Sequence, residues 1–241
     1  MEKTDIIEKL IHFHLSRQEA ILFLCLVEHG KLTGYEAGKL TGISRSNVYT
    51  ALNALADKGA AMMLESGTST YYEAVEPEEF MTNQLRRLGA DREYLLKHMP
   101  RMASSKEGYL TIQGADNIRD KAYNMISGCE LRLYLAASEE IVEQLRAVLQ
   151  EVKKRGLKVV IISDGNYSRL ATYYYPDKPE RGQLRLIIDS AYVLTGELTG
   201  SSTDTCLYSG QENLVTVMKE ALRNKIKLLE IEGIKKEREN D

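Results

Sequence analysis

Apolar residues in the first third of the chain recur with the spacing of amphipathic helices. A leading helix is predicted over residues 2–14, and a second runs from Ser16 to Glu28. The second contains the run AILFLCLV, which is apolar on every side, so we expect this helix to form the centre of an N-terminal core. Ser16 and Glu19 have the spacing of a capping box at its start.

The next stretch predicts two short helices separated by a tight turn. Thr33 and Glu36 have the spacing of a capping box for the first helix, which Gly42 ends. Ser44 is the expected N-cap of the second helix, which ends at Gly59. A two-stranded ribbon follows, so the order of elements is that of a winged helix-turn-helix domain.

The second of these helices has one apolar and one polar face. The apolar stripe, expected to be buried, consists of Val48, Leu52 and Leu55. The polar face carries side chains of the kind that contact phosphates and base edges. The predicted DNA-binding residues are Ser44, Arg45, Ser46, Asn47, Tyr49, Thr50 and Asn53. We expect Arg45 and Asn47 to contact bases or backbone, and Tyr49 and Thr50 to contact phosphates.

Residues 60–75 alternate loosely around Gly67, which predicts the two strands and the turn of a wing. The expected tip, from Ser66 to Thr70, is small and polar. Two interpretations remain open: the tip contacts DNA phosphates, or the hairpin only covers the core.

A linker helix is predicted from Pro77, because a proline at the first helical position is followed by acidic residues. Apolar residues then follow the spacing of a heptad seam, which Arg92 interrupts. The predicted dimerisation residues are Met81, Leu85, Leu88, Leu95 and Met99. We expect a short coiled coil that pairs two subunits; the alternative is an ordinary helix packed on its own domain. Residues 101–108 are predicted as a linker.

Strands and helices alternate from residue 109 to residue 233, which predicts an α/β layer structure. The predicted strands lie at 109–114, 130–137 and 157–164, with two more within 185–198. The predicted helices lie at 117–128 and 138–156, with a long final helix from about residue 211. The charged residues 234–241 are expected to fray.

The segment between residues 164 and 183 is too long to be a simple connection. It follows the carboxyl end of a strand, where open α/β sheets bind ligands. Its tyrosines and arginines suit a small polar molecule such as a sugar or an anion. The predicted ligand-binding residues are Asp164, Tyr167, Arg169, Tyr173, Arg181 and Asp189. The alternatives are a tyrosine-rich flap over the sheet, a dimer interface, and turn-capping roles for the two aspartates.

Charge gives limited support to DNA binding. The 241-residue chain has a net charge of −3, and residues 1–75 hold 7 Lys and Arg against 9 Asp and Glu. We therefore expect weak non-specific binding and reliance on a dimer. The three cysteines are far apart and lack metal-ligand spacing, which favours reduced thiols in a cytoplasmic protein with no metal or cofactor. No run reaches the ~18 apolar residues of a membrane span, so no membrane partner is expected.

The stretches LTGISRSNVYTALNALADKGA and YYEAVEPEEF resemble TrmB-like transcriptional regulators, most strongly over residues 15–100. In that family a Gly-[Ile/Val]-x-[Arg/Lys]-x-x-x-Tyr core opens the recognition helix, and Pro-Glu-Glu opens a linker helix. The matching residues are Gly42, Ile43, Arg45, Tyr49, Pro77, Glu78 and Glu79. The resemblance implies a DNA-binding regulator.

The stretches AVLQEVKKRGLKVVIISD and RLIIDSAYVLTGEL are similar to the phospholipase D superfamily. Its His-x-Lys-x-x-x-x-Asp motif, aligned on Asp189, places Gly182 at the position of the nucleophilic His and Leu184 at that of the Lys. Neither residue can act as nucleophile or cation, so we expect no catalysis. TrmB-like regulators often carry such a degenerate domain, which implies a role in sensing or dimerisation.

These patterns predict an α+β multidomain protein. The expected parts are a winged helix-turn-helix domain over 1–76, a linker and dimerisation helix over 77–100, a phospholipase-D-like α/β regulatory domain over 109–233, and a tail over 234–241. We expect a homodimer on a palindromic operator in double-stranded DNA, with half-sites ~34 Å apart, and a small polar effector such as a sugar. Two other functions remain open: a winged helix that binds a protein instead of DNA, and a phosphodiesterase.

Overall fold

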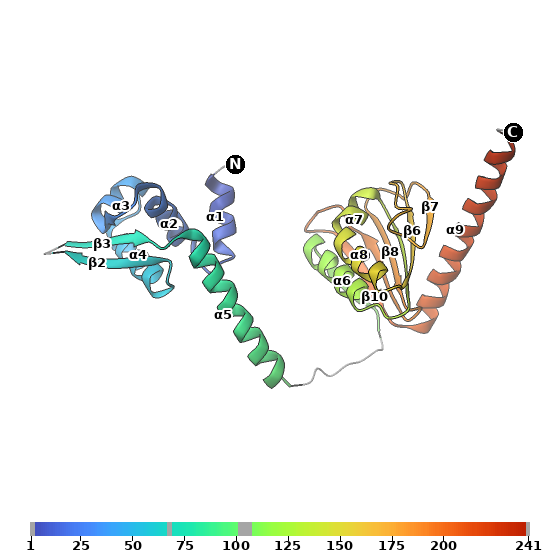
Figure 1. Cartoon of the computed structure of the whole chain (residues 1–241), viewed down its shortest axis with the longest axis horizontal. Helices are drawn as coiled ribbons and strands as arrows, with labels where there is room; N and C mark the ends of the chain where they lie inside the picture. Colours follow the sequence, from blue (N-terminus) through green and yellow to red (C-terminus); the bar gives the residue numbers. More distant parts are fainter. Residues whose placement is uncertain (1–2, 67–68, 101–107, 240–241) are drawn as a thin grey trace. The chain divides into compact units, whose positions relative to one another are not determined.

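The computed structural model describes residues 3–66, 69–100 and 108–239, with side chains described as far as Ile231. These residues form two compact units, one before and one after residues 101–107 (Figure 1). The predicted linker lies outside the described residues except for Gly108, as do residues 67 and 68 at the predicted wing tip. Within the described parts of the chain, no helix has the length and apolar character needed to cross a membrane.

The core of the N-terminal unit is built from packed helices. They are α1 (Lys3–Ile11), α2 (Arg17–His29), α3 (Gly34–Thr41) and α4 (Arg45–Asp57). As predicted, α2 is central: Leu22, Phe23 and Leu26 are buried in one cluster with the apolar stripe of α4. Both predicted capping boxes are confirmed, at the starts of α2 and α3.

A small antiparallel sheet completes this unit, in the order β1-β3-β2. The predicted ribbon is present as β2 (Ala61–Ser66) and β3 (Ser69–Ala74). The structure adds β1 (Leu32–Thr33), which pairs with Tyr71 and Tyr72 of β3. Two residues are too few to show the period of a strand, so this pairing has no signal in the sequence.

The linker helix α5 (Pro77–His98) is anchored at its start. Phe80 is buried against Phe23, with ring centroids 5.5 Å apart, and Gln84 is buried one turn further on. From Leu85 to the end of the helix every residue is exposed. Most of α5 therefore has no packing partner within the described residues of this chain.

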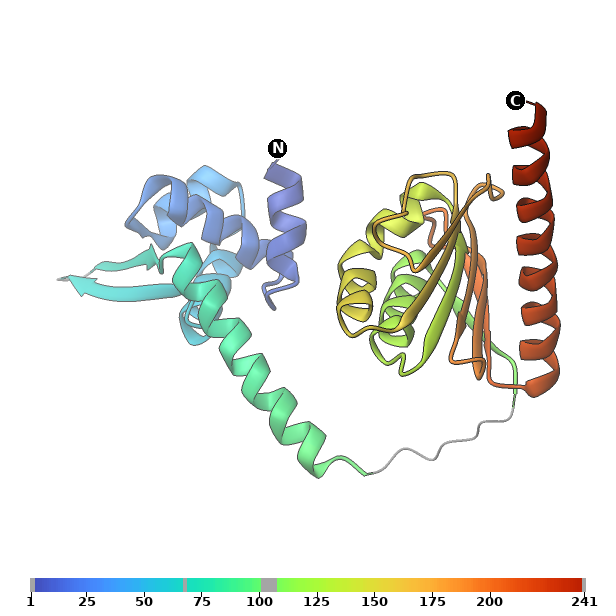
Figure 2. The same ribbon diagram turned by 45° about the vertical axis from the view of Figure 1, so that its right-hand side comes forward.

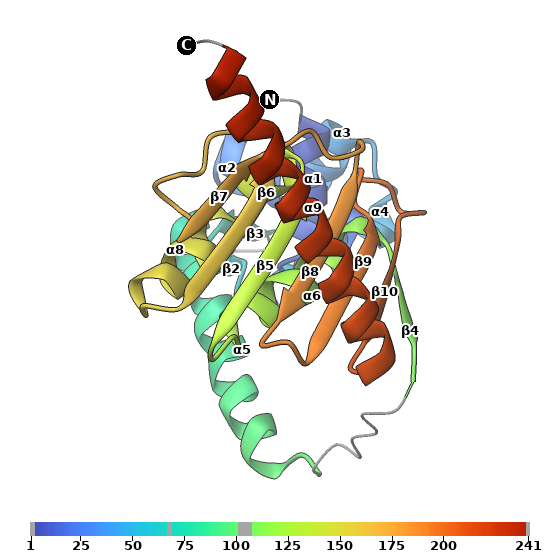
Figure 3. The ribbon, with the colours of Figure 1, turned by 90° about the vertical axis from the view of Figure 1, so that its right-hand side faces the viewer.

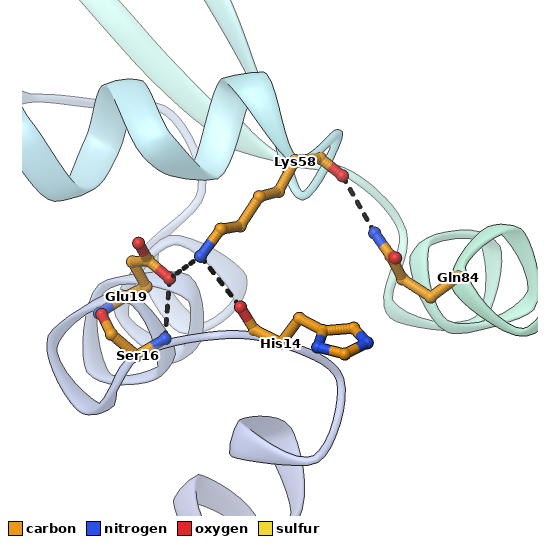
Figure 4. A network of polar contacts seen from close by, with 5 residues as sticks. All are labelled: His14, Ser16, Glu19, Lys58 and Gln84. Carbon is orange, nitrogen blue, oxygen red and sulfur yellow. Dashed lines mark hydrogen bonds and ion pairs between the residues drawn. The ribbon is translucent and has the colours of Figure 1, made fainter. Parts of the chain in front are cut away.

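Lys58, directly after α4, connects three helices of the unit (Figure 4). Its ammonium group donates to Glu19 Oε2 at 2.5 Å and to the His14 carbonyl oxygen at 2.8 Å. The same Glu19 oxygen accepts the backbone N–H of Ser16 at 2.7 Å. Gln84 of α5 donates to the Lys58 carbonyl oxygen at 3.0 Å. The cluster therefore ties the end of α4 to the start of α2 and to α5.

In the described part of the C-terminal unit, seven strands form one mixed sheet in the order β4-β10-β9-β8-β5-β6-β7. They are β4 (Leu110–Gln113), β5 (Arg132–Ala137), β6 (Lys158–Ser163), β7 (Tyr173–Pro176), β8 (Gln183–Ile188), β9 (Tyr192–Glu197) and β10 (Thr205–Ser209). One face is covered by α6 (Ala115–Ser127), α7 (Glu139–Gln144) and α8 (Arg146–Lys154), and α9 (Glu212–Glu239) crosses the other (Figure 2).

Some elements of this unit differ from the prediction. Strand β7 lies inside the segment predicted as a long loop, and β10 was not expected. Both are short, and their strand form depends on pairing within the sheet. The helix predicted over 138–156 is divided at Leu145 into α7 and α8. α9 continues to Glu239, into the tail predicted to fray, where Glu, Lys and Arg residues favour a helix; residues 240 and 241 lie outside the described residues, and the fraying stays a prediction.

Replacing Lys58 with Met should destabilise the N-terminal unit by about 1–3 kcal/mol, because the Glu19 carboxylate then stays buried without a cation. The Glu19 side chain is 9% exposed and that of Lys58 is 35% exposed, so solvent screens part of the loss. The free energy of opening is measured from hydrogen exchange of the α2 and α4 amides.

Arg17→Gln is the control for this measurement, because it removes an ion pair with Glu8 whose two side chains are 59% and 51% exposed. Its effect should stay below about 0.5 kcal/mol. Equal effects of the two substitutions would show that the Lys58–Glu19 pair does not stabilise the unit beyond a surface pair.

Candidate nucleic-acid interface

The first turn of α4 is exposed and uncapped. Ser44 occupies the N-cap with an extended backbone, but its hydroxyl makes no capping bond. Arg45, Ser46 and Asn47 follow it and are all exposed. The first backbone N–H groups of a helix have no acceptor within the helix, and here no side chain supplies one. Such a helix end attracts anions, above all phosphate.

Arg45 supplies the positive charge of this turn. Its guanidinium has no ion-pair partner among the described residues, and its side chain is exposed. The cation at the opposite end of α4, Lys58, is instead bound to Glu19. The charge available on this helix for an external anion therefore lies at its N-terminal end.

Tyr49 has a packing role that the sequence did not reveal. Its ring is half-buried and lies directly on the backbone of Gly34, the first residue of α3. A side-chain carbon added at Gly34 would lie 2.5 Å from Tyr49 Cε1, so the approach requires glycine. The phosphate contact of Tyr49 stays a prediction, whereas its position on Gly34 sets the spacing of the two helices in the motif.

Two further candidates on α4 have partners within the domain. The Thr50 hydroxyl donates to the Ser46 carbonyl oxygen at 3.0 Å. Asn53 Oδ1 accepts the hydroxyl of Tyr72 in β3 at 2.8 Å. Both side chains remain at the exposed surface, so their unused polar atoms still face outward. Tyr72 orients the Asn53 amide and joins the helix to the wing.

The wing extends away from the core. Met62, Met63 and Leu64 of β2 are 51%, 53% and 39% exposed, and the strand is exposed on both faces after Ala61. Most of β2 therefore does not cover the core, which disfavours the purely structural interpretation of the hairpin. Its apolar side chains are available to a binding partner.

The six predicted ligand-binding residues do not form one site. Asp164 accepts the backbone N–H of Glu139 at 2.7 Å, at the start of α7. Tyr167 is 2% exposed, and its hydroxyl donates to Glu143 at 2.8 Å. Burial is the largest cause that raises the pKa of Tyr167, and the hydrogen bond to Glu143 is the next largest. The hydrogen bonds from Arg146 and Tyr167 lower the pKa of Glu143 to about 2. These two candidates therefore hold α7 in place.

Asp189 lies at the opposite end of the sheet from Asp164. It has a left-handed backbone conformation, with φ of 53°, and follows β8 beside the start of β5. Its carboxylate accepts the N–H groups of Glu130, Leu131 and Arg132 at 2.7–2.9 Å. Burial by itself would raise the pKa of Asp189, but these N–H donors hold it below its usual range. Asp189 is therefore a cap for the backbone, and the ligand role predicted for it is not supported.

Arg169 and Arg181 are exposed on connections between strands. Tyr173 lies in β7, with the ammonium group of Lys158 4.8 Å from its ring centroid. A cleft of about 490 Å³ lies between α9 and the strands β5 to β8, and among the six candidates Tyr173 lines it. Two cations that the sheet contributes to this cleft, Arg132 and Lys158, are absent from the predicted site residues. The available signal was their place on one face of neighbouring strands.

The positions aligned with the phospholipase D motif are structural. Leu184 is fully buried in the core beneath α6 and α8. Gly182 has φ of 75°, and a side-chain carbon there would lie 2.6 Å from Thr199 Cγ2. In the described part of the chain, no group of three or more His, Cys, Asp or Glu residues is placed to hold a metal ion.

The geometry of the N-terminal unit defines it as a winged helix-turn-helix domain. Residues 10–78 match the family described as sugar-specific transcriptional regulator TrmB. The chain therefore carries a TrmB-family domain at its N-terminus, which confirms the resemblance found in the sequence.

Curated relatives extend the match beyond this domain. The uncharacterized protein YrhO of Bacillus subtilis is 25% identical over 98% of this chain and 89% of its own length. The HTH-type sugar sensing transcriptional regulator TrmBL1 of Pyrococcus furiosus is 27% identical over 70% of this chain, and the match spans 50% of TrmBL1.

Among solved structures, TrmBL2, described as an archaeal chromatin protein with a novel mode of DNA binding, aligns with 94% of this chain and 99% of its own. Its identity is 22% and its TM-score 0.43. Nuc from Salmonella typhimurium, a phospholipase D family member, aligns with 50% of this chain and 95% of its own, at 17% identity and a TM-score of 0.38. Similarity at this level defines no activity. The predicted α+β class, with a winged helix before an α/β unit, is confirmed by the elements themselves.

Asp189→Asn should destabilise the protein by about 1–3 kcal/mol at pH 7, because an amide accepts fewer of the three backbone N–H groups. Asparagine tolerates the left-handed backbone, so the substitution tests the hydrogen bonds and not the turn. The folded-state pKa is lowered, so the stabilisation is present above the unfolded pKa of about 3.9 and is lost as the pH falls through the folded value. The difference between variant and wild type should therefore shrink in strong acid.

Urea unfolding followed by circular dichroism measures this difference at pH 7 and at pH 3. Asp116→Asn is the control, since the Asp116 side chain is 90% exposed. A difference for Asp189→Asn that does not change with pH would contradict a role for its charge.

Proposed function

We propose that this protein is a sequence-specific DNA-binding transcriptional regulator. The observation that carries the proposal is the exposed, uncapped first turn of α4, with Arg45 unpaired among the described residues, within a TrmB-family winged helix. The backbone N–H groups and Arg45 suit a DNA phosphate, and Ser46 and Asn47 suit base edges. The relative TrmBL1, described as a sugar sensing transcriptional regulator, supports the same function.

We further propose that the protein acts as a homodimer paired through α5. Four of the five predicted seam residues are exposed: Leu85 at 61%, Leu88 at 42%, Leu95 at 51% and Met99 at 63%. An apolar row of this length is covered when a second copy packs against it. Two recognition helices would then meet half-sites of a palindrome about one helical turn apart.

Dimerisation would also compensate for the net negative charge of the N-terminal unit, which weakens its binding to DNA. Residues 1–75 hold 7 cations against 9 anions, and Lys58 is bound within the fold. One unit therefore attracts the phosphate backbone weakly. Pairing two units raises the affinity for DNA without a new kind of contact. Once the first unit is bound, the second unit binds the same DNA intramolecularly.

We propose no catalytic role for the C-terminal unit. Gly182 and Leu184 offer no nucleophile or cation at the positions aligned with the phospholipase D motif, and Leu184 is buried. The name of TrmBL1 as a sugar-sensing regulator supports a role in binding an effector.

Arg45→Ala should weaken binding to duplexes that the wild-type protein selects from a random library, by about 5- to 100-fold, the loss expected for one arginine contact. If Arg45 contacts a phosphate, the slope of log affinity against log salt concentration should also fall in magnitude by about one. Arg17→Ala removes the same charge near the opposite end of α4 and should change affinity little.

Fluorescence anisotropy at several salt concentrations measures both quantities. Unchanged affinity for Arg45→Ala would remove this residue from the interface. If the wild-type protein selects no duplex, or binds DNA with a flat salt dependence, a winged helix that binds another protein is the better interpretation.

Leu88→Glu should convert the dimer to a monomer, because it places a charge in the centre of the apolar seam. Ala90→Glu is the matched control: it introduces the same charge two residues away, on the outer face of the same helix. Sedimentation equilibrium of the full chain gives the mass. A monomeric wild-type protein, or a dimer that survives Leu88→Glu, would contradict pairing through α5.

A further inference from the structure

The face of the sheet beneath α9 carries a concentrated positive charge. Figure 3 shows α9 crossing β5, β6 and β8 on this face. Arg132 of β5 and Lys158 of β6 stand directly opposite each other in the parallel ladder. Like charges at opposed positions of neighbouring strands destabilise a sheet. Packing of the fold does not explain this pair.

α9 brings three further cations to the same cleft. Lys219, Arg223 and Lys227 are spaced by four residues, so they lie on one face of the helix, and all three line the cleft with Arg132 and Lys158. Like charges at this spacing repel each other and weaken an isolated helix. The sheet and the helix thus both place like charges close together, on the two surfaces that line the cleft.

These five cations have no ion-pair partner among the described side chains. None of them forms an ion pair there, whereas Lys225 of the same helix pairs with Asp177 at 2.9 Å. The carboxylate that lines the cleft, Glu230, accepts the hydroxyl of Tyr175 at 3.0 Å. The cleft therefore presents five positive charges against one negative charge.

The rest of the lining suits the carbon skeleton of a ligand. Tyr134, Tyr173 and Tyr175 provide aromatic rings, and Val160, Ile187, Leu222 and Ile226 provide an apolar floor and wall. The volume of about 490 Å³ falls within the size of small-molecule sites. Arginine guanidinium groups bind carboxylate and phosphate oxygens alike in a bidentate manner. The excess of positive charge in this cleft favours a phosphate, which carries about −1.5 to −2 at pH 7, over a single carboxylate as the ligand group.

We propose that this cleft binds a phosphorylated small molecule, with its phosphate groups against Arg132, Lys158 and the α9 cations and its carbon skeleton against the tyrosines. Cations from the sheet and from the helix above it converge on one compact volume, which fits a small ligand better than a duplex. Binding would remove the repulsion between the two layers. If the chain is the regulator proposed above, this ligand is its effector; that link rests on the proposed function, whereas the binding itself does not.

Isothermal titration of the full chain without DNA tests the site. The probes are pyrophosphate, fructose 1,6-bisphosphate and ADP, with fructose as the uncharged comparison. At least one phosphorylated probe should bind with one site per chain, and fructose should bind at least about tenfold more weakly. Arg223→Gln should weaken that binding at least about tenfold, because it removes a guanidinium from the middle of the cationic row.

Lys225→Gln is the matched control, since it removes one positive charge from the same helix outside the cleft. It should leave ligand binding unchanged. The melting temperature without ligand should not fall for Arg223→Gln, because the substitution relieves repulsion; ligand should raise the melting temperature of the wild type more than that of the variant.

The proposal is overturned if no phosphorylated probe binds at millimolar concentration, or if both glutamine variants weaken binding equally. It is also overturned if a short DNA duplex binds in an Arg223-dependent manner while all small probes fail, since the cleft would then contact a nucleic-acid backbone. These outcomes do not depend on whether Arg45 contacts DNA. The proposed ligand site and the proposed DNA-binding function can therefore fail separately.

Discussion

The ion pair between Lys58 and Glu19 determines how the N-terminal unit presents its recognition helix. A carboxylate that is 9% exposed requires a cation and further donors, and Lys58 and the Ser16 N–H provide them. The end of α4 is thereby fixed to the start of α2, and Gln84 extends the connection to α5. At the other end, Tyr49 on Gly34 sets the distance between the two helices of the motif. The first turn of α4 is thus held in place while its own polar groups remain free.

In the N-terminal unit, charged side chains stabilise the fold more than they attract the DNA phosphates. Lys58 neutralises Glu19 inside the domain, and the unit as a whole is slightly acidic. The proposed DNA-binding regulator would therefore gain little from long-range electrostatic steering and would depend on local geometry at the N-terminal end of α4. In the proposed homodimer, DNA affinity depends on the exposed apolar side of α5, since pairing would double a contact that is weak by itself.

The two faces of the C-terminal sheet have different physical characters. The face toward α6, α7 and α8 is a continuous apolar core, and Asp164, Tyr167 and Asp189 secure its edges with hydrogen bonds. The face toward α9 combines a smaller apolar cluster with a cleft lined by unpaired cations. The larger buried cluster therefore lies on the first face, and the cleft lies on the second.

Local signals in the sequence were enough for the elements that depend on neighbouring residues. Capping boxes, the stripe of α4, the start of α5 at Pro77 and the family motif around Arg45 are all short-range patterns, and they identified the winged helix. The tertiary structure alone decided what depends on contacts between distant residues. It formed β1, β7 and β10 by pairing, gave Tyr49 a packing role, and separated Asp164 from Asp189 at opposite ends of the sheet. It also brought Arg132 and Lys158 together with the cations of α9, because a charge cluster assembled from separate strands and a helix leaves no spacing to recognise along the chain.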